Sequence, residues 1–410
     1  MRTIKTFKII VLFFLFIRLG LLPTFSAAFR SSVKDINKVN IKELSNAQNS
    51  FALKLFSKVT QNDENSFLSP YSIHTALLLA YTGAGENTRK EMANTLSVSE
   101  IKTGRLKEKS RQLKDYLEKI SPAKETELAV ANALFLKDTI PFINRYKKNA
   151  AKYFKAEISS LPRKGETVNQ WVQENTKDKI EKIINPGPVP GNVIAYLVNA
   201  IYFKSIWEEK FDPKKTSERP FYSAQEKEVN MMENKAEYRY SISENIQTVT
   251  VPYKDGSYLF HAFMPPENKL TNFYDNLTVD DLKNVKPTDK EKIILRLPKF
   301  TLKDDLSLSD ILQNMGIKKA FNRGQANFSN MVNLKKISPL NVFINEVFHS
   351  SFIEVDEKGT EAAAATAIDM RTTSVPQEPP IIEFNRPFFF MIEEAQTETI
   401  LFMGQLVNPE

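Results

Sequence analysis

The sequence has 410 residues, 42% of them hydrophobic, which is enough to bury a large core. Its net charge of +7 is small for this length and spread along the chain, so it does not indicate a nucleic-acid-binding protein. The absence of cysteine excludes disulfide bonds and cysteine-based zinc sites.

The N-terminus has the three parts of a secretory signal peptide: positive charge, a short apolar run and small residues. These parts are Arg2, Lys5 and Lys8, then the run 9–17, then the segment 24–28. We therefore expect a signal peptide over residues 1–28, cleaved near Ser26 or Ala28, and a secreted, extracellular protein. Arg18 shortens the apolar run, which leaves a signal anchor as the alternative. No later segment is apolar enough to predict a membrane span.

The next third of the chain predicts helices at 46–60, 73–81 and 101–119. Ser69 and Pro70 form a start signal for the second helix, because serine caps free N–H groups and proline suits the first turn. In the third helix, Lys107, Arg111 and Lys114 lie near one face, among interleaved acidic residues. That face is interpreted as solvated, with weak glycosaminoglycan binding as the alternative.

The middle and the C-terminal part predict a mixture of strands and helices. Asp255 and Gly256 form a two-residue turn signal inside the hairpin 249–264. The other expected elements are strands at 127–137, 193–211, 293–300 and 341–355, helices at 169–184 and 306–321, and a final hairpin of residues 388–392 and 400–407.

The segment that follows the strand 341–355 supports two interpretations. Gly359 is a flexible joint, and the four alanines between Glu361 and Thr366 favour a short helix. The same small residues also suit a mobile strand that leaves a loop and enters a β-sheet. Residues 371–380 are polar and rich in proline, which is typical of an exposed loop.

The run EKGTEAAAAT at 357–366 resembles the hinge of the serpins, the serine protease inhibitor family. Other motifs in the right order resemble the same family over residues 46–410. They are Ser69 and Ser72 beneath the central sheet, Asn199 with His349, Trp207, Lys299 opposite Glu357, and the segment 384–388. The resemblance implies an α+β fold in one large domain, with three β-sheets, about eight or nine helices and a reactive-centre loop at about 357–380. Residues 29–45 would be an N-terminal extension.

The resemblance also implies a function. A serine protease would cut the loop and become trapped as an acyl-enzyme while the loop inserts into the main sheet. The hinge would comprise Glu357, Gly359, Thr360, Glu361, Ala362, Ala363, Ala364, Ala365 and Thr366. Every second residue from Thr360 would point inward on insertion, and none of these is charged, bulky or proline.

The family spacing counted from Glu357 places the cleaved bond at Thr373–Ser374, which suits an elastase-like protease. Arg371–Thr372 lies two residues earlier and would suit a trypsin-like protease. Both assignments stay open.

Two other functions remain as alternatives: a non-inhibitory serpin that acts as a carrier or chaperone, and a glycosaminoglycan-binding serpin. No motif for catalysis, metal binding or a cofactor is present, so we expect an inhibitor rather than an enzyme, and a monomer. Asn276 and Asn327 begin N-glycosylation sequons, which a secreted protein can use.

Overall fold

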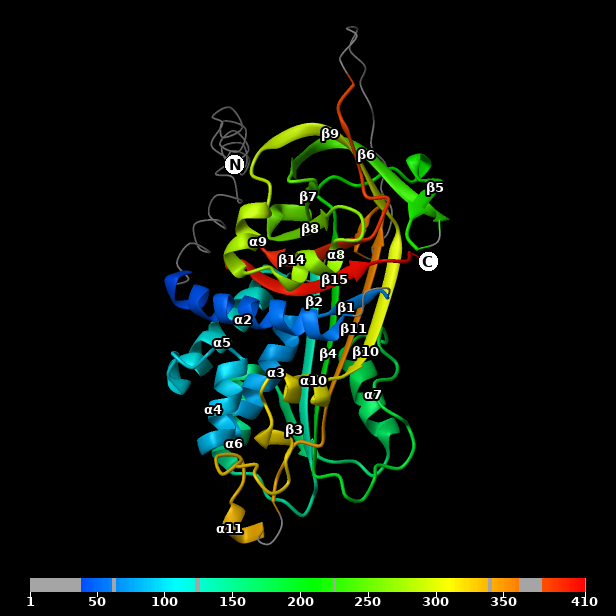
Figure 1. Cartoon of the computed structure of the whole chain (residues 1–410). Coiled ribbons are helices and arrows are strands. Elements are labelled where there is room, and N and C mark those ends of the chain that lie inside the picture. The colour runs from blue at the N-terminus through cyan, green and yellow to red at the C-terminus, as the bar shows by residue number, and fades with distance from the viewer. Residues whose placement is uncertain are drawn as a thin grey trace, which may run out of the picture. The chain divides into compact units, whose positions relative to one another are not determined.

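The computed structural model describes residues 38–60, 64–121, 126–224, 226–337, 341–360 and 378–409 (Figure 1). Residues 41–410 form one compact unit. The expected signal peptide, the hinge residues 361–366 and both candidate bonds between 371 and 374 lie outside the described residues.

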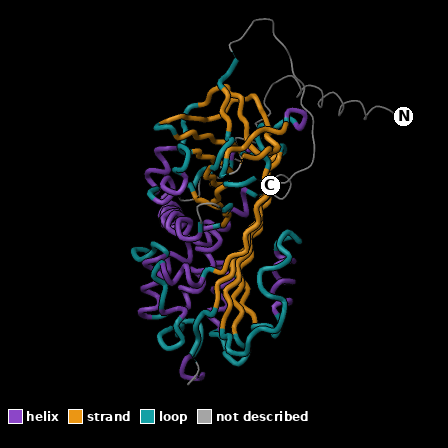
Figure 2. The backbone as a smooth tube through the Cα atoms, turned by 45° about the vertical axis from the view of Figure 1, so that its right-hand side comes forward, coloured by secondary structure: helices purple, strands orange, loops and turns teal. Residues whose placement is uncertain are grey.

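A six-stranded sheet has the order β10-β11-β12-β4-β2-β3, and its longest strands form the near-parallel ribbons seen in Figure 2. β11 runs parallel to β4, and β2 runs parallel to β3, whereas the other neighbours are antiparallel. The strands are β2 (Thr126–Leu136), β3 (Glu157–Ser160), β4 (Ala195–Ile206), β10 (Phe300–Ser307), β11 (Glu346–Asp356) and β12 (Gly359–Thr360).

The other strands form one continuous nine-stranded set. It is continuous because the 18-residue strand β6 pairs with β5 and β9 along its first part and with β7 at its end. Divided at β6, it gives two smaller sheets, so the three expected sheets are present. The strands are β1 (Ser66–Leu68), β5 (Ser217–Tyr222), β6 (Glu226–Ser243), β7 (Ile246–Pro252), β8 (Tyr258–Met264), β9 (Lys290–Pro298), β13 (Ile381–Glu383), β14 (Phe388–Glu394) and β15 (Thr399–Leu406).

The described residues contain ten α-helices, one or two more than expected. The helix α3 confirms its start signal, since the Ser69 side chain accepts a hydrogen bond from the Ser72 N–H and Pro70 is the first helical residue. The helices are α2 (Lys38–Val59), α3 (Pro70–Gly83), α4 (Glu86–Thr95), α5 (Thr103–Ile120), α6 (Asn144–Asn149), α7 (Gly165–Asn175), α8 (Leu270–Asp275), α9 (Val279–Val285), α10 (Ser309–Asn314) and α11 (Leu334–Ile337), with a π-helical turn, η1 (Ala150–Phe154), directly after α6.

An aromatic core joins the two sets of strands. Phe203 of β4 lies 5.4 Å from Tyr258 and 5.8 Å from Phe402, measured between ring centroids. Phe67 of β1 stacks on Phe402 at 5.3 Å. All four side chains are buried. This packing joins β4 of the six-stranded sheet to β1, β8 and β15 of the other set.

The predicted helix 169–184 is wrong at both ends, because α7 begins at Gly165 and stops at Asn175. Lys177 and Asp178 adopt left-handed backbone angles, with φ of 53° and 62°, which end the helix. The Asn169 side chain then accepts hydrogen bonds from the N–H groups of Ile183 and Ile184 at 3.0 and 3.1 Å. A tertiary contact therefore replaces the second half of the predicted helix.

The predicted helix 306–321 is also wrong. β10 continues to Ser307, because it pairs with β11 over eight residues from Phe300 to Ser307. Only the short α10 and a 3₁₀ turn at Lys319–Phe321 remain helical, and Gly316 interrupts them with φ of 114°.

The hairpin expected at 249–264 is present as β7 and β8, but its turn is longer than two residues. A 3₁₀ turn, Lys254–Gly256, connects the strands, and Tyr253 N–H donates to Tyr258 O at 3.0 Å to close it. The Asp-Gly signal therefore locates the turn correctly and predicts its length wrongly.

Candidate functional site

The described part of the hinge, residues 357–360, lies where β4 and β11 separate. The two strands pair directly, in parallel, from Tyr196 and Glu346 to Tyr202 and Phe352. Beyond that point β12 lies between them and pairs antiparallel with both: Thr360 is opposite Ser205 on β4 and Val355 on β11. The first two hinge residues that follow the turn at 357–358 are therefore already part of the sheet.

Gly359 is required at this position. Its φ is +153°, and an added Cβ would lie 2.1 Å from the Ser205 carbonyl oxygen and 2.5 Å from Ile206 Cα. The Asp356 carboxylate closes the turn by accepting hydrogen bonds from Lys358 N–H at 2.8 Å and Gly359 N–H at 3.1 Å. Only glycine lets the chain turn this sharply against β4.

Thr360 is fully buried, and its Oγ1 lies 2.7 Å from the Tyr253 hydroxyl. Burial raises the pKa of Tyr253, so this hydroxyl stays protonated and able to donate. A small polar side chain fits here, whereas a large or charged one would lose this partner and be buried without compensation.

Glu357, in the turn before β12, is held by two partners. Lys299 Nζ lies 3.0 Å from one carboxylate oxygen, and Thr216 Oγ1 donates to the other at 2.7 Å. Burial acts to raise the pKa of Glu357, but the hydrogen bonds from Thr216 and Lys299 outweigh burial and hold that pKa below its usual value. Glu357 is therefore ionised at neutral pH, and the expected contact with Lys299 is present.

Trp207 fixes the other side of the turn. Its backbone N–H donates to Lys358 O and its indole Nε1–H donates to Asp356 O, each at 2.9 Å. The ring stacks on Tyr253 at a centroid distance of 4.4 Å and an angle of 15°. This buried aromatic pair therefore holds both the turn and the partner of Thr360.

A second cluster lies earlier along β4, where β4 and β11 pair directly. His349 and Asn199 are directly opposite each other, and His349 Nδ1 lies 2.6 Å from Asn199 Oδ1. His349 Nε2 lies 3.1 Å from the backbone nitrogen of Ser69, which can only donate. Asn199 also donates to Ser72 Oγ and, at 2.7 Å, to Asn132 Oδ1.

These contacts fix the protonation state of His349. Because Nε2 accepts from Ser69, the proton must be on Nδ1, where it is donated to Asn199. Burial lowers the pKa of His349 to about 3, so the ring stays neutral in the folded protein at any ordinary pH. The cluster is a closed, fully paired network that bridges the two strands.

Acidification should weaken the folded state through His349. Between pH 7.5 and 5.5 His349 becomes protonated in the unfolded chain but stays neutral in the folded protein, because its folded pKa is about 3. The folded state is therefore destabilised relative to the unfolded state as the pH falls below about 6.5. We expect a loss of about 1.3 kcal/mol from this one group. The measurement is urea unfolding at both pH values for wild type and His349→Gln.

The glutamine variant retains an acceptor for Ser69, and it should lose about 1.3 kcal/mol less than wild type over this pH range. The comparison uses the change in the free energy of unfolding with pH, so it remains valid even if the variant is less stable than wild type at both pH values. Equal pH dependence in the two proteins would contradict the assignment.

The structure thus brings the predicted residues together in two clusters rather than one. Glu357, Gly359, Thr360, Trp207 and Lys299 meet at the hinge, whereas Ser69, Ser72, Asn199 and His349 meet seven residues earlier along β4. The prediction missed three partners, Asn132, Thr216 and Tyr253. Asn132 could have been noticed, because it interrupts an apolar strand; no local pattern marks the other two.

The basic face expected on α5 is largely neutralised. Arg111 makes ion pairs with Glu108 and with Asp115, and Lys114 pairs with Asp115 at 2.8 Å. Lys107 differs, because its Nζ lies 5.3 Å from the centre of the Tyr153 ring rather than against a carboxylate. Two of the three charges are therefore satisfied within the helix, which weakens their use for an extended polyanion.

The two sequons differ in exposure. Asn276 is exposed, just after α8, and Thr278 of the same sequon caps α9 through Asp281. Asn327 is half-buried, and its Oδ1 accepts from Ser329 N–H at 3.1 Å. If the chain is glycosylated, Asn276 is the position we expect to be used.

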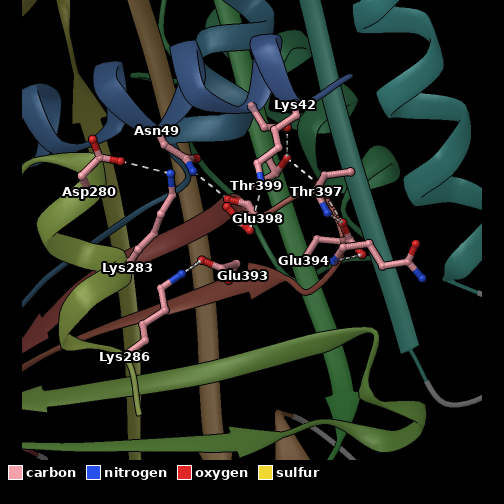
Figure 3. Close-up of polar contacts among 12 residues, drawn as sticks. Lys42, Asn49, Asp280, Lys283, Lys286, Glu393, Glu394, Thr397, Glu398 and Thr399 are labelled. Carbon is pink, nitrogen blue, oxygen red and sulfur yellow. Dashed lines mark hydrogen bonds and ion pairs between the residues drawn. The ribbon is translucent and has the colours of Figure 1, made fainter. Parts of the chain in front are cut away.

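A charged cluster at the turn between β14 and β15 was not predicted (Figure 3). Glu393 is buried and ion-paired with Lys286, which follows α9. Burial raises the pKa of Glu393, and Lys286 opposes that rise. Lys283, one turn earlier, makes an exposed pair with Asp280 at 3.2 Å. Glu398 connects the same turn to α2 by two contacts. Its carboxylate lies 3.0 Å from Lys42 Nζ, and its carbonyl oxygen accepts a hydrogen bond from Asn49 Nδ2 at 2.6 Å.

One trio within this region has the order hydroxyl, imidazole, carboxylate. Thr250 Oγ1 lies 2.9 Å from His261 Nδ1, and His261 Nε2 lies 3.9 Å from Glu393 Oε1. All three residues are no more than 4% exposed, and burial holds the pKa of His261 well below its usual value. The trio has no opening through which a substrate could reach it.

Within the described residues, no group of three or more histidine, aspartate or glutamate side chains is arranged to hold a metal ion. Among the helices of the same residues, none combines the length and hydropathy that a transmembrane helix needs.

Comparisons with known proteins converge on one family. The sequence model of the serpins (serine protease inhibitors) matches residues 46–409. An uncharacterised serpin-like protein of Methanosarcina acetivorans is 30% identical, covering 94% of this chain and 92% of the relative. Bovine antithrombin-III is 30% identical, with 90% and 82% coverage, and iripin-2 of the tick Ixodes ricinus is 32% identical, with 89% and 93%.

Solved structures agree with this result. Human thyroxine-binding globulin in complex with thyroxine has a TM-score of 0.81 and 27% identity, covering 90% of this chain and 99% of that one. The thermophilic serpin tengpin in its native state has a TM-score of 0.79 and 28% identity, with 89% and 94% coverage.

Proposed function

The chain belongs to the serpin family, and we propose that it is a secreted inhibitor of serine proteases that acts as a suicide substrate. The single observation that carries this proposal is the position of β12. The first residues of the hinge already lie between β4 and β11, paired with both, so the sheet holds the beginning of a path along which the loop can insert.

The chemistry of the proposed reaction belongs to the protease. Its serine oxygen attacks the carbonyl carbon of the loop residue before the cleaved bond, the C–N bond breaks, and the new amino terminus takes up a proton and leaves. The loop then remains attached to the protease as an ester. Inhibition requires that insertion be faster than the attack of water on that ester.

The register of β12 defines what insertion would do. Continued at the same register, residues 361–369 would be antiparallel to both β4 and β11, as Thr360 is now. One parallel ladder would be exchanged for two antiparallel ones, with additional hydrogen bonds and buried small side chains. The uncut protein would then be a kinetically trapped form.

The same register places Thr366 opposite both Asn199 and His349, because these two residues are partners in the present ladder. Insertion would separate His349 from Asn199 and put a threonine hydroxyl between them. The buried network is therefore proposed as the latch that keeps the sheet closed, and Thr366 as the residue that takes over its polar partners.

The test mixes the purified protein with trypsin and, separately, with elastase, followed by a denaturing gel and mass analysis of the released C-terminal peptide. We expect a covalent complex with elastase and cleavage at Thr373–Ser374. A covalent complex with trypsin and cleavage at Arg371–Thr372 would support the inhibitor proposal but move the cleaved bond from Thr373–Ser374 to Arg371–Thr372. Cleavage by both proteases without a covalent band would remove the inhibitor proposal for these two protease classes.

A small-molecule carrier is the second candidate. The observation that favours it is the likeness to thyroxine-binding globulin, a serpin solved with thyroxine bound. The uncharged, small residues of the hinge favour the inhibitor, because a carrier has no need of a loop that can insert. Absence of a covalent complex with any serine protease would shift the choice to the carrier.

A further inference from the structure

A pocket of about 350 Å³ is lined by residues of α4, α5, α6 and the C-terminal end of α3. Figure 1 shows where these four helices lie. Its lining includes three cationic side chains from three different helices: Arg89 from α4, Lys107 from α5 and Arg145 from α6. No aspartate or glutamate lines it among the described residues.

Among the described residues, no carboxylate forms an ion pair with these three cations, in contrast to their neighbours on α5. On α5, Arg111 and Lys114 are paired with acidic side chains of the same helix. Arg89 and Lys107 instead rest on aromatic rings, Arg89 at 5.9 Å from the Tyr81 centroid and Lys107 at 5.3 Å from that of Tyr153. Cation–π contacts orient the two side chains and leave their charge uncompensated.

Three of the five uncharged lining side chains use their donors elsewhere. Thr82 and Tyr146 donate to the Leu79 carbonyl at 2.8 and 3.1 Å, and the Asn330 amide donates to the Ala84 carbonyl at 2.9 Å. Arg89 Nε–H is buried without a partner in the described residues. Unpaired buried donors are rare in folded proteins, so what this pocket lacks is an acceptor.

We propose that this pocket binds a small molecule that carries a phosphate or sulfate group. Arginine presents planar, paired donors that match two oxygens of such a group, and three cations balance the charge of a dianion. The volume is at the lower end of the range for small-ligand sites, about 300–1,000 Å³. It fits one phosphorylated or sulfated sugar.

The test is isothermal titration of the full-length protein at constant ionic strength. The ligands are inorganic phosphate, glucose 6-phosphate and a sulfated disaccharide, with chloride as the blank. We expect saturable binding of one ligand per chain. Equal affinity for phosphate and glucose 6-phosphate would show that the pocket recognises the anion alone. Tighter binding of glucose 6-phosphate or of the sulfated disaccharide would show whether the pocket prefers a phosphorylated or a sulfated sugar.

The variants Arg89→Gln and Arg145→Gln should each weaken binding at least tenfold. Arg145 is exposed, so its replacement leaves the fold intact even if Arg89 contributes to packing. Arg105→Gln is the matched control, because it removes the same charge from an exposed position of α5 outside the pocket. Equal weakening by the control, a response that does not saturate, or no heat above the chloride blank would overturn the proposal.

Discussion

On the proposed mechanism, replacing Thr360 with arginine is expected to turn the chain into a substrate of serine proteases instead of an inhibitor. Thr360 is fully buried between β4 and β11, and its hydroxyl pairs with Tyr253. An arginine would bring an unpaired charge into this space, at a cost of several kcal/mol. The altered hinge should therefore stay outside the sheet, and the loop behind it should not insert after cleavage.

The variant should still fold, because β12 has only two residues and can leave the sheet while β4 and β11 keep their direct ladder. Both candidate bonds lie at least eleven residues further along the chain, so a protease should cut either of them as before. The measurement is the ratio of covalent complex to cleaved protein on a denaturing gel. We expect that ratio to fall by at least tenfold.

Thr301→Arg is the matched control. Thr301 lies on β10 in the same sheet but is exposed, so the same chemical change should leave the ratio unaltered. A stable covalent complex formed by the Thr360 variant, at the wild-type ratio, would contradict the assignment of this residue to the inserting face.

Local sequence predicted elements well where several signals agreed. α3 has a serine cap, a proline in its first turn and a continuous apolar body, and all three act on neighbouring residues. The predictions over 169–184 and 306–321 failed because distant partners decided the outcome. Asn169 captures the backbone of Ile183 and Ile184, and β11 holds β10 in extended form beyond Leu306.

The hinge shows the same limit at the candidate site. Local propensity suggests a flexible joint at Gly359, whereas Gly359 and Thr360 form a strand, because two neighbouring strands offer hydrogen bonds on both sides. The alanines, for which a short helix was one interpretation, lie outside the described residues. The family resemblance supplied the pairs of Lys299 with Glu357 and Asn199 with His349. Their further partners, Thr216, Tyr253 and Asn132, depend on the register of pairing, which a single sequence does not contain.

Replacing Lys286 with methionine should be the most destabilising single change at the β14–β15 turn. Lys286 is mostly buried, and its partner Glu393 is 5% exposed in its side chain. Removing the lysine leaves a buried carboxylate beside His261, whose Nε2 lies 3.9 Å away and whose ring is neutral, so it cannot replace the lost charge. Loss of one partner of a buried ion pair costs roughly 3–5 kcal/mol. Urea unfolding at pH 7.5 measures this loss.

Two controls separate the ion pair from general damage. Lys283→Met removes the same charge from α9, but its partner Asp280 is 88% exposed in its side chain, so we expect a loss below about 1 kcal/mol. Adding Glu393→Gln to the Lys286 variant should recover most of the loss, because the buried charge is then gone. A similar loss from both lysine variants would show that the burial of Glu393 is unimportant.

The pH dependence gives an independent check with a definite sign. Burial already raises the pKa of Glu393, and without Lys286 that pKa should rise further. A carboxyl group whose folded pKa is raised favours the folded state at low pH and loses that contribution as the pH rises through the folded pKa. The stability deficit of Lys286→Met should therefore be largest at pH 7.5 and shrink toward pH 5, opposite in direction to the effect of His349. A deficit that does not change with pH would mean that Lys286 stabilises the turn by packing rather than by charge.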